Sequence, residues 1–457
     1  MIIQLLCDHK WRDLPNLVVL KIRLNSLGHK VYISSTKDSE AMISIFKPDC
    51  VVINNLFSRR NRRLAQLLKK LNVIIILLPT EGAVRPEFKK IMDGDFANYD
   101  LIDLILPWSE ISAKGIRKRW RFSKERVKVA GYNRLDFYNK KMINIVEKKD
   151  IFCSRHDLNP NKPIVTWATQ YGYAFLIHKE KYSQHFEQWL RESKETGQSS
   201  CWKEIGINPK DIPKIHAKGR ENAGKAFFKL TKIFPNVQFL IKPHPSEDID
   251  YYKNLIIENS SKNVILLQKE YIWDVLNATD IELHRHCTTA IESWVWNKPT
   301  IEMAMDSHPK LIWKDRERGS DVVKTDKELI KIISKYIKNS EVSNNIKSFR
   351  KNYIKKWFGD ADGNRINYTA DIINDFLLVR PSKKKLYDFH ILGVSSLNLL
   401  KSRIRYFLNI KPNEKILKFF KPKTNDNIAH DKLITRSDVI NYEKKLISLK
   451  SKILTKS

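Results

Sequence analysis

Cysteine is scarce in this chain, and its distribution argues against a fold held together by disulfides or by zinc. The 457 residues hold 5 cysteines, at positions 7, 50, 153, 201 and 287. An odd number without paired spacing argues against a disulfide framework and against a zinc site of the Cys-x-x-Cys type. The fold must therefore be held together by a hydrophobic core.

Long apolar runs are also missing. The strongest run, residues 73–78, is far shorter than the roughly 20 residues that a membrane-spanning helix needs. The first residues reach Asp8 too soon to form the apolar region of a signal peptide. We therefore expect a cytoplasmic protein, peripheral on the inner face of the cytoplasmic membrane if it meets a membrane at all.

Acidic residues are outnumbered. The chain has 83 Lys and Arg against 51 Asp and Glu, a formal net charge of +32. This excess favours an anionic partner such as a phosphorylated substrate, a nucleic acid or an acidic membrane surface. Lysine-rich chains also arise from AT-biased genomes, so charge alone does not choose among these partners.

Short β-branched runs alternate with helical stretches over the first 150 residues, which is typical of a parallel sheet covered on both faces. Strands are predicted at 2–7, 31–34, 50–53, 73–78, 101–106 and 127–130. The pattern restarts with strands at 164–169, 238–242, 264–267, 281–283 and 300–303, after which helices continue to about 378. We predict an α/β protein of two Rossmann-like, doubly wound domains, 1–150 and 151–380, with a polar insertion at about 171–213.

The last 77 residues, 381–457, differ from both domains. They hold 18 Lys and Arg against 6 Asp and Glu, with apolar residues at helical spacing. Two interpretations remain open for this basic helical extension. It lies on an anionic membrane surface, or it is an appendage that packs on the second domain.

The segment that carries the clearest chemistry follows the strand at 238–242. It reads Lys242-Pro243-His244-Pro245, and the two prolines restrict the backbone around the imidazole. Ligands of open α/β sheets bind beyond the carboxyl ends of the strands, where His244 and Lys242 could contact a phosphate group. The competing interpretation is a buried histidine that supports a turn.

A second polar cluster, Arg285 to Glu292, follows the strand at 281–283. Thr288 or Thr289 could cap the next helix and meet a phosphate, and Glu292 could accept the hydroxyls of a ribose. Alternatively, Glu292 forms only a capping box with Thr289. The residues His284, His286 and Cys287 do not favour a metal site, because adjacent strand residues point in opposite directions and no fourth ligand is evident.

Together these motifs resemble the donor-binding half of GT-B glycosyltransferases. The match rests on Lys-Pro-His-Pro and on Thr288-Thr-Ala-Ile-Glu-Ser-Trp followed by Asn297-Lys-Pro-Thr-Ile-Glu. It is closest to bacterial surface-carbohydrate proteins of capsule and lipopolysaccharide assembly, related to His-Pro-motif Kdo and sialyltransferases. Residues 129–136 are similar to the Gly-Asn-Pro-Arg-x-Asp element of these proteins, with Tyr132-Asn133 where Asn-Pro is usual.

The resemblance implies a GT-B-like fold with an interdomain cleft and assigns roles to single residues. His244 would meet the donor phosphate together with Lys242, Arg285, Thr288 and Thr289, and Glu292 would hold the ribose. Thr169 and Gln170, at the end of the strand at 164–169, could bind sugar hydroxyls, or the neighbouring aromatic residues could simply pack.

The first domain offers a candidate base and a candidate acceptor surface. Glu81 follows the fourth strand and could deprotonate an acceptor hydroxyl, unless residues 80–82 are simply a solvated loop. Lys114, Arg117, Lys118 and Arg121 lie on a basic helix that could hold an anionic glycan or a lipid-linked acceptor, although such runs are usually solvated helix faces.

We therefore expect a glycosyltransferase that uses a nucleotide sugar in surface polysaccharide biosynthesis, with His244 and Glu81 as catalytic residues. We expect transfer without a metal, no cofactor besides the nucleotide sugar as co-substrate, and no nucleic-acid partner. One alternative keeps the fold in a UDP-sugar epimerase or a CDP-polyol phosphotransferase. Another is a non-enzymatic basic protein that binds RNA or a membrane.

Overall fold

The structure is a computed structural model. It describes residues 1–56, 58–81, 99–195, 198–305, 308–311, 315–380, 400, 402–404, 406–407 and 432–454. These residues form two compact units, each built around one parallel sheet. The described residues up to Asp136 and from Trp357 onward make the first unit, and Phe137–Lys356 the second.

The first unit contains a five-stranded parallel sheet in the order β2-β1-β3-β4-β5. Its strands are β1 (Ile2–Cys7), β2 (Lys30–Ser35), β3 (Cys50–Ile53), β4 (Ile74–Leu77) and β5 (Leu104–Ile105). Its first helices are α1 (Lys10–Ser26), α2 (Ser39–Phe46), α3 (Arg59–Lys70) and α5 (Glu110–Trp120). The predicted strand at 127–130 is wrong, because this segment forms only an isolated bridge between Val127 and Ile105.

The sheet of the first unit is covered by amphipathic helices. On α3, Ser58 caps the N-terminus by accepting from the amide of Asn61, and Leu64 and Leu68 are fully buried. Both leucines join a core with sheet residues such as Val51 and Ile75. Near-continuous apolar strands of this kind require helices on both faces, as the sequence predicts.

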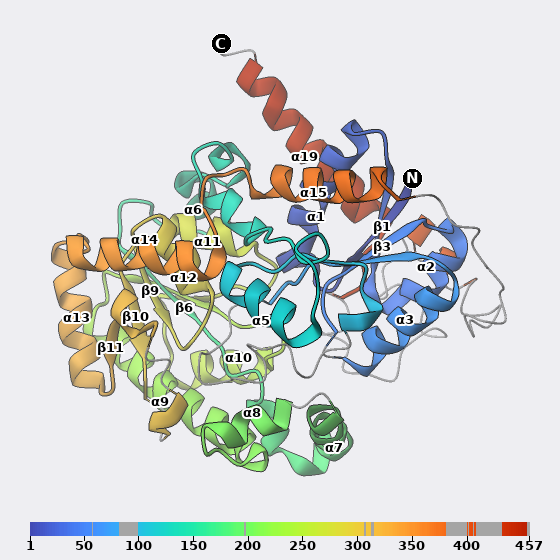
Figure 1. The fold of residues 1–457 in the computed structure, drawn as a ribbon. Helices are drawn as coiled ribbons and strands as arrows, with labels where there is room; N and C mark the ends of the chain where they lie inside the picture. Colours follow the sequence, from blue (N-terminus) through green and yellow to red (C-terminus); the bar gives the residue numbers. More distant parts are fainter. Residues whose placement is uncertain are drawn as a thin grey trace. The chain divides into compact units, whose positions relative to one another are not determined.

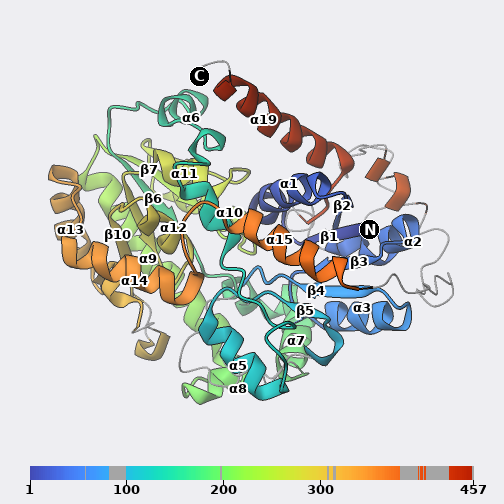
Figure 2. The ribbon, with the colours of Figure 1, turned by 45° about the horizontal axis from the view of Figure 1, so that its top comes forward.

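Helix α15 (Arg365–Leu378) belongs to the first unit, whereas the sequence predicts residues up to 380 to belong to the second domain. Arg23 of α1 pairs with Asp371 at 2.9 Å, and His29 lies 3.2 Å from the side-chain oxygen of Asn374. Figure 2 shows α15 beside α1. The first unit is thus completed by chain that follows the second.

The described parts of the C-terminal extension also pack on the first unit, so the alternative in which the extension packs on the second domain is wrong for these parts. Helix α19 (Arg436–Leu454) pairs with α1 through Lys10–Asp438 and Lys21–Glu443. The hydroxyl of Tyr406 donates to a carbonyl oxygen of β2 at 2.9 Å. None of the described helices is long and apolar enough to cross a membrane.

The second unit contains a six-stranded parallel sheet in the order β11-β10-β9-β6-β7-β8. Its strands are β6 (Ile164–Ala168), β7 (Gln238–Lys242), β8 (Val264–Leu266), β9 (Ile281–His284), β10 (Thr300–Met303) and β11 (Asp321–Val323). Five of these strands are predicted by the sequence. The short edge strand β11 is not, because its three residues give too little periodicity to detect.

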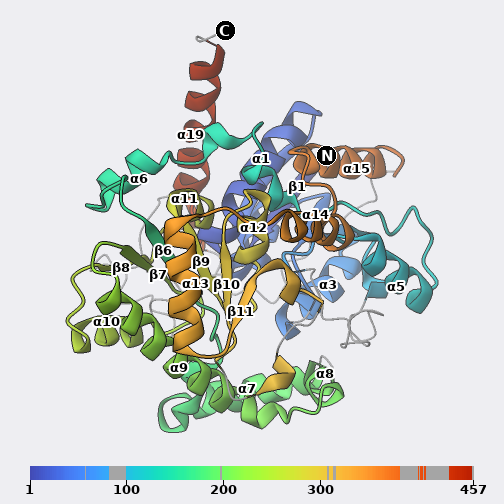
Figure 3. The same ribbon diagram turned by 90° about the vertical axis from the view of Figure 1, so that its left-hand side faces the viewer.

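Helices cover both faces of this second sheet. Helices α9 (Ile212–Ile233), α10 (Ile249–Glu258) and α13 (Asp326–Lys338) share one core with it, and Figure 3 shows α13 in front of the strands. Helices α6 (Lys149–Arg155) and α11 (Ile272–Ala278) bury the other face. Helices α12 (Thr289–Val295) and α14 (Asn344–Phe358) complete the connections (Figure 1). The polar insertion forms α7 (Lys179–Glu195) and α8 (Gln198–Glu204).

Candidate functional site

The residues predicted to bind a donor gather at one edge of the second sheet. Strand β6 lies between β9 and β7, and Ala168 pairs with His284 on one side and Lys242 on the other. In a parallel sheet the carboxyl ends of neighbouring strands share one edge, so the segments that follow these three strands lie close together. This edge holds the candidate site of the second unit.

His244 has a defined orientation in this site. Its backbone amide donates to the hydroxyl of Thr169 at 3.2 Å. Its Nδ1 accepts from the backbone amide of Ser246 at 3.2 Å and lies 2.7 Å from Ser246 Oγ. Because Nδ1 accepts a backbone hydrogen bond, a neutral His244 carries its proton on Nε2. The imidazole is therefore arranged as a donor through Nε2 and is only half-buried.

Glu247 forms hydrogen bonds that connect the segment after β6 to the segment after β7, which carries His244. Its side chain is buried, and one carboxylate oxygen accepts from Thr169 Oγ1 at 2.9 Å and from the amide of Tyr171 at 2.7 Å. The other oxygen accepts from the hydroxyl of Tyr252. Burial raises the pKa of Glu247 above its usual value, although these hydrogen bonds oppose the shift. The sequence does not predict this role of Glu247, because its only signal is a carboxylate shortly after the His-Pro motif.

Gly172 allows the segment after β6 to approach the segment after β7. A Cβ atom at this position would lie 2.5 Å from Ser246 Oγ, which is too close for a real contact. The same atom would lie 3.8 Å from His244 Nδ1, an ordinary distance. The absence of a side chain at Gly172 is therefore needed for the Ser246–His244 contact.

Arg285, which is expected to contact a donor, instead pairs with a buried carboxylate of the protein. Its side chain is buried, and Nη1 lies 2.6 Å from Glu302. His286 Nδ1 lies 2.8 Å from the same carboxylate, and burial and the Arg285 charge lower the pKa of His286 to about 3. Burial alone would raise the pKa of Glu302, but the hydrogen bond with His286 and the positive charge of Arg285 hold it below its usual value. This cluster acts as an internal ion pair.

Two buried carboxylates lie in β9 and in the segment that follows it. Glu292 is fully buried and accepts from the hydroxyl of Tyr138 at 2.6 Å, so no exposed oxygen is left for a ribose. Thr289 donates to Glu282 at 2.5 Å. The capping box of Thr289 with Glu292 is also wrong, because the N-cap of α12 is Thr288 and the Thr289 hydroxyl is bound to Glu282. Thr288 and Thr289 remain half-buried at the edge of the sheet.

The other residues predicted for donor binding lie at the same edge. Lys242 donates to the carbonyl of Gln268 at 3.0 Å, and Gln170 is half-buried directly after Thr169. In the described part of the chain, no group of three or more His, Cys, Asp and Glu side chains is arranged to hold a metal ion.

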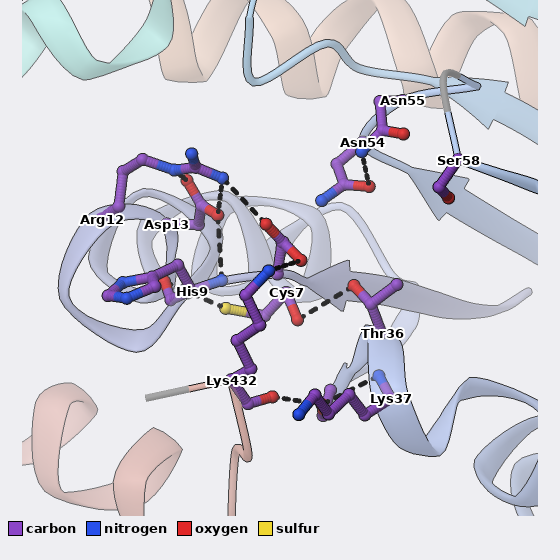
Figure 4. A network of polar contacts seen from close by, with 12 residues as sticks. Cys7, His9, Arg12, Asp13, Thr36, Lys37, Asn54, Asn55, Ser58 and Lys432 are labelled. Carbon is purple, nitrogen blue, oxygen red and sulfur yellow. Dashed lines mark hydrogen bonds and ion pairs between the residues drawn. The ribbon is translucent and has the colours of Figure 1, made fainter. Parts of the chain in front are cut away.

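The first unit carries a polar network at the carboxyl ends of its strands (Figure 4). Arg12 donates to Asp13 at 2.8 Å, to Asp8 at 3.2 Å and to Glu81 at 3.3 Å. Glu81, the candidate base, thus forms an ion pair, with 60% of its side chain exposed. Burial and the nearby aspartates raise the pKa of Cys7, which makes this thiol a poor nucleophile.

The basic helix predicted to hold an acceptor is α5. Arg117 is bound to its own unit, because its guanidinium donates to the carbonyl of Val127 at 2.7 Å and pairs with Glu110 at 2.6 Å. Lys114, Lys118 and Arg121 are exposed. The structure therefore presents three of the four predicted cations to solvent.

Comparison with known proteins identifies the fold. No protein-family model matches the chain, and no curated protein matches it in sequence. The S. aureus MnaA–UDP co-structure matches with a TM-score of 0.54 and 13% identity, covering 84% of this chain and 99% of that one. The UDP-GlcNAc 2-epimerase from Neisseria meningitidis, bound to UDP-GlcNAc, gives a TM-score of 0.50 at 13% identity over 83% and 100%.

A third solved structure, UDP-GlcNAc 2-epimerase from Methanocaldococcus jannaschii in complex with UDP-GlcNAc and UDP, gives a TM-score of 0.50 at 12% identity, over 82% of this chain and 100% of that one. Similarity at such low identity establishes architecture rather than chemistry. It confirms the predicted fold class. The chain has a GT-B-like fold of two Rossmann-like α/β domains.

Proposed function

We propose that the protein is a glycosyltransferase that binds a nucleotide sugar through its second unit and acts in surface polysaccharide biosynthesis. The observation that supports this most is the orientation of His244. With Nδ1 held by the Ser246 amide, a neutral His244 carries its proton on Nε2, and we propose that this N–H group donates to an oxygen of the donor's diphosphate. Such a bond strengthens as negative charge develops on the departing nucleotide.

The neighbouring groups support the same assignment. Thr169 and Glu247 hold His244 in place, and Lys242, Thr288 and Thr289 lie on segments that end at the same sheet edge. Because Glu292 and Arg285 are committed to buried partners, we assign no donor contact to either. Glu81 remains the proposed base for the acceptor hydroxyl, and we propose transfer without a metal.

A second candidate function is epimerisation of a UDP-sugar. The solved structures that share this fold include UDP-GlcNAc 2-epimerases, and two of them hold UDP-GlcNAc. The same His244 donor would serve either reaction, because both place negative charge on a nucleotide diphosphate when the bond to the sugar breaks. The two functions differ in whether an acceptor is needed.

Calorimetric titration of the full chain with UDP, CDP and GDP tests the donor site. We expect one of these nucleotides to bind, and we expect His244→Ala to weaken its binding about tenfold or more, as for loss of a hydrogen bond to a charged group. His178→Ala is the matched control, because His178 is exposed in the same unit. Unchanged affinity in His244→Ala would remove the assignment.

Product analysis then separates the two reactions. With the nucleotide sugar alone, an epimerase forms an isomeric nucleotide sugar, whereas a transferase leaves the sugar unchanged until an acceptor glycan is added. Isomer formation without acceptor would replace the transferase proposal with the epimerase.

A further inference from the structure

A pocket lies within the first unit, where α1 meets the carboxyl ends of β1, β3 and β4. Its volume is about 470 Å³, part of which is open solvent. Apolar side chains make up much of its wall: Leu6, Leu17, Val52, Leu78, Trp108 and Tyr132. The aromatic pair Trp108 and Tyr132 is tightly packed, with ring centroids 4.0 Å apart. The polar part of the wall is made by side chains that are far apart in the sequence.

Three asparagines in this wall have polar atoms without a partner among the described residues. They are Asn16 Oδ1, Asn54 Nδ2 and Asn133 Nδ2, each shielded from solvent. Asn54 and Asn133 each expose only 4% of their surface. Buried amide groups are almost always hydrogen-bonded, so three such atoms around one pocket indicate that a ligand or ordered water completes them.

The amide of Asn54 is fixed in its orientation by its neighbours. Its oxygen accepts from Asn55 Nδ2 at 3.1 Å and from Asn61 Nδ2 at 3.3 Å, so its nitrogen is the atom left to face the pocket. Figure 4 shows this nitrogen turned away from Asn55, on the side of Asp13. Asn133 is held in a similar way, because its oxygen accepts from Thr369 Oγ1 at 2.8 Å.

The charged groups in the wall favour a neutral ligand. Asp13 and Arg134 contribute one charge of each sign. The Asp13 carboxylate already accepts from Arg12 at 2.8 and 3.0 Å and from the amide of His9 at 3.1 Å. The three asparagine groups that lack a partner are two amide donors and one amide acceptor, none of which is charged.

We propose that this pocket binds an uncharged sugar residue, the acceptor of the reaction proposed above. A sugar hydroxyl both donates and accepts, so it can satisfy Asn54 and Asn133 as well as Asn16, while ring C–H groups pack against the apolar wall. Only the identification of this sugar as the acceptor rests on the proposed function; the binding of a sugar does not depend on it. It replaces the basic face of α5 with a neutral pocket as the acceptor site.

The test is an NMR titration of the full chain with glucose, galactose, mannose and N-acetylglucosamine as neutral probes. Glucuronate and glucose 6-phosphate serve as charged probes. We expect at least one neutral sugar to bind more tightly than either charged one. If none of the neutral sugars binds up to its solubility limit, or if a charged probe binds more tightly, the proposal is wrong.

Two variants remove pocket groups that the protein itself does not use. Asn16→Leu deletes the unpartnered acceptor, and Asn54→Asp deletes the unpartnered donor while keeping the oxygen that Asn55 and Asn61 contact. Each should weaken sugar binding about fivefold or more. Asn16→Leu should leave the melting temperature unchanged or raise it, which separates a lost ligand contact from a folding defect. Asn367→Leu, at an exposed position of α15, is the control.

If the pocket holds only water, Asn16→Leu will keep full affinity for any sugar that binds, and the proposal falls. The nucleotide titration of the same preparations distinguishes the two proposals. If the protein binds a nucleotide but none of the sugars, only the proposal for the pocket is contradicted. Sugar binding without nucleotide binding would overturn the proposed function and leave a neutral-sugar site in the first unit.

Discussion

The carboxylate of Glu247 accepts from Thr169 Oγ1 at 2.9 Å and so ties the segment after β6 to the segment after β7. Thr169 in turn accepts from the backbone amide of His244 at 3.2 Å. The catalytic candidate is thus positioned through a threonine by a buried carboxylate that need not touch substrate. Glu247 is a positioning residue, and its removal should affect both stability and ligand affinity.

Replacing Glu247 with alanine should destabilise the second unit by about 3 kcal/mol or more, because three buried donors lose their acceptor at once. These donors are Thr169 Oγ1, the amide of Tyr171 and the hydroxyl of Tyr252. Urea unfolding measures the loss. Nucleotide affinity, measured below the unfolding transition, should fall as well because His244 loses its support.

Glu247→Gln is the control for this prediction. A glutamine oxygen can keep the bonds from Thr169 and Tyr171, and its amide can donate to the tyrosine oxygen. We therefore expect Glu247→Gln to retain most of the stability and the affinity. Equal losses in both variants would show that the charge, rather than the hydrogen-bond geometry, holds these segments.

Adding one methyl group at Gly172 should disturb His244 without touching it. The new Cβ would lie 2.5 Å from Ser246 Oγ, so the serine side chain must move away from the imidazole. We expect Gly172→Ala to weaken nucleotide binding several-fold, as for the loss of one hydrogen-bonded contact. Calorimetric titration gives the value.

The double variant Gly172→Ala with Ser246→Ala should lose no more affinity than Ser246→Ala alone, because each single variant already removes the Oγ contact with His244. Removing Oγ removes the atom that the Cβ would meet, while the Ser246 amide can still donate to His244 Nδ1. The cycle of two single variants and one double variant isolates this coupling. Strictly additive losses would contradict the steric explanation.

Ten of the eleven strands in the described residues and the sheet edge that carries the candidate site follow from the sequence, because buried parallel strands are near-continuous apolar runs. His244 and Thr169 follow two such runs, so their proximity comes from topology. The partner that each polar side chain contacts could not be predicted in the same way. Glu292 looks available in sequence, yet its partner Tyr138 is 154 residues away.

The asparagine pocket shows the same limit more clearly. Asn16 lies on α1, Asn54 follows β3 and Asn133 follows the isolated bridge, so no local pattern connects them. Only the tertiary structure reveals that they line one cavity with apolar walls. Asparagine is also common in ordinary turns, which hides a binding role in the sequence.

The buried carboxylate of Glu282 should make stability depend on pH. Burial raises the pKa of Glu282 to about 7 from an ordinary value of 4.5, although hydrogen bonds from Ser293 and Thr289 oppose the shift. Between these values the unfolded chain releases the proton while the folded chain retains it. The free energy of unfolding should therefore fall as pH rises through this window, by about 3 kcal/mol in total.

Glu282→Gln removes this titration, because an amide does not ionise. We expect the variant and the parent protein to have similar stability near pH 4.5 and to diverge by about pH 8, with the variant more stable. Urea unfolding at several pH values measures the divergence. A difference between the two proteins that does not change with pH would mean that Glu282 does not titrate in this range.

The ion pair between Lys21 and Glu443 should help to dock α19 on α1. Its two side chains expose 17% and 20% of their surface, so the pair contributes less than about 1 kcal/mol in solution. Lys21→Glu places like charges together and should release α19, which is seen as faster proteolytic cleavage within residues 432–454. Lys21→Glu with Glu443→Lys restores opposite charges and should restore protection. If cleavage is equally fast in all three proteins, the extension does not dock on α1 in solution, and binding of the full chain to anionic vesicles becomes the better account of its basic charge.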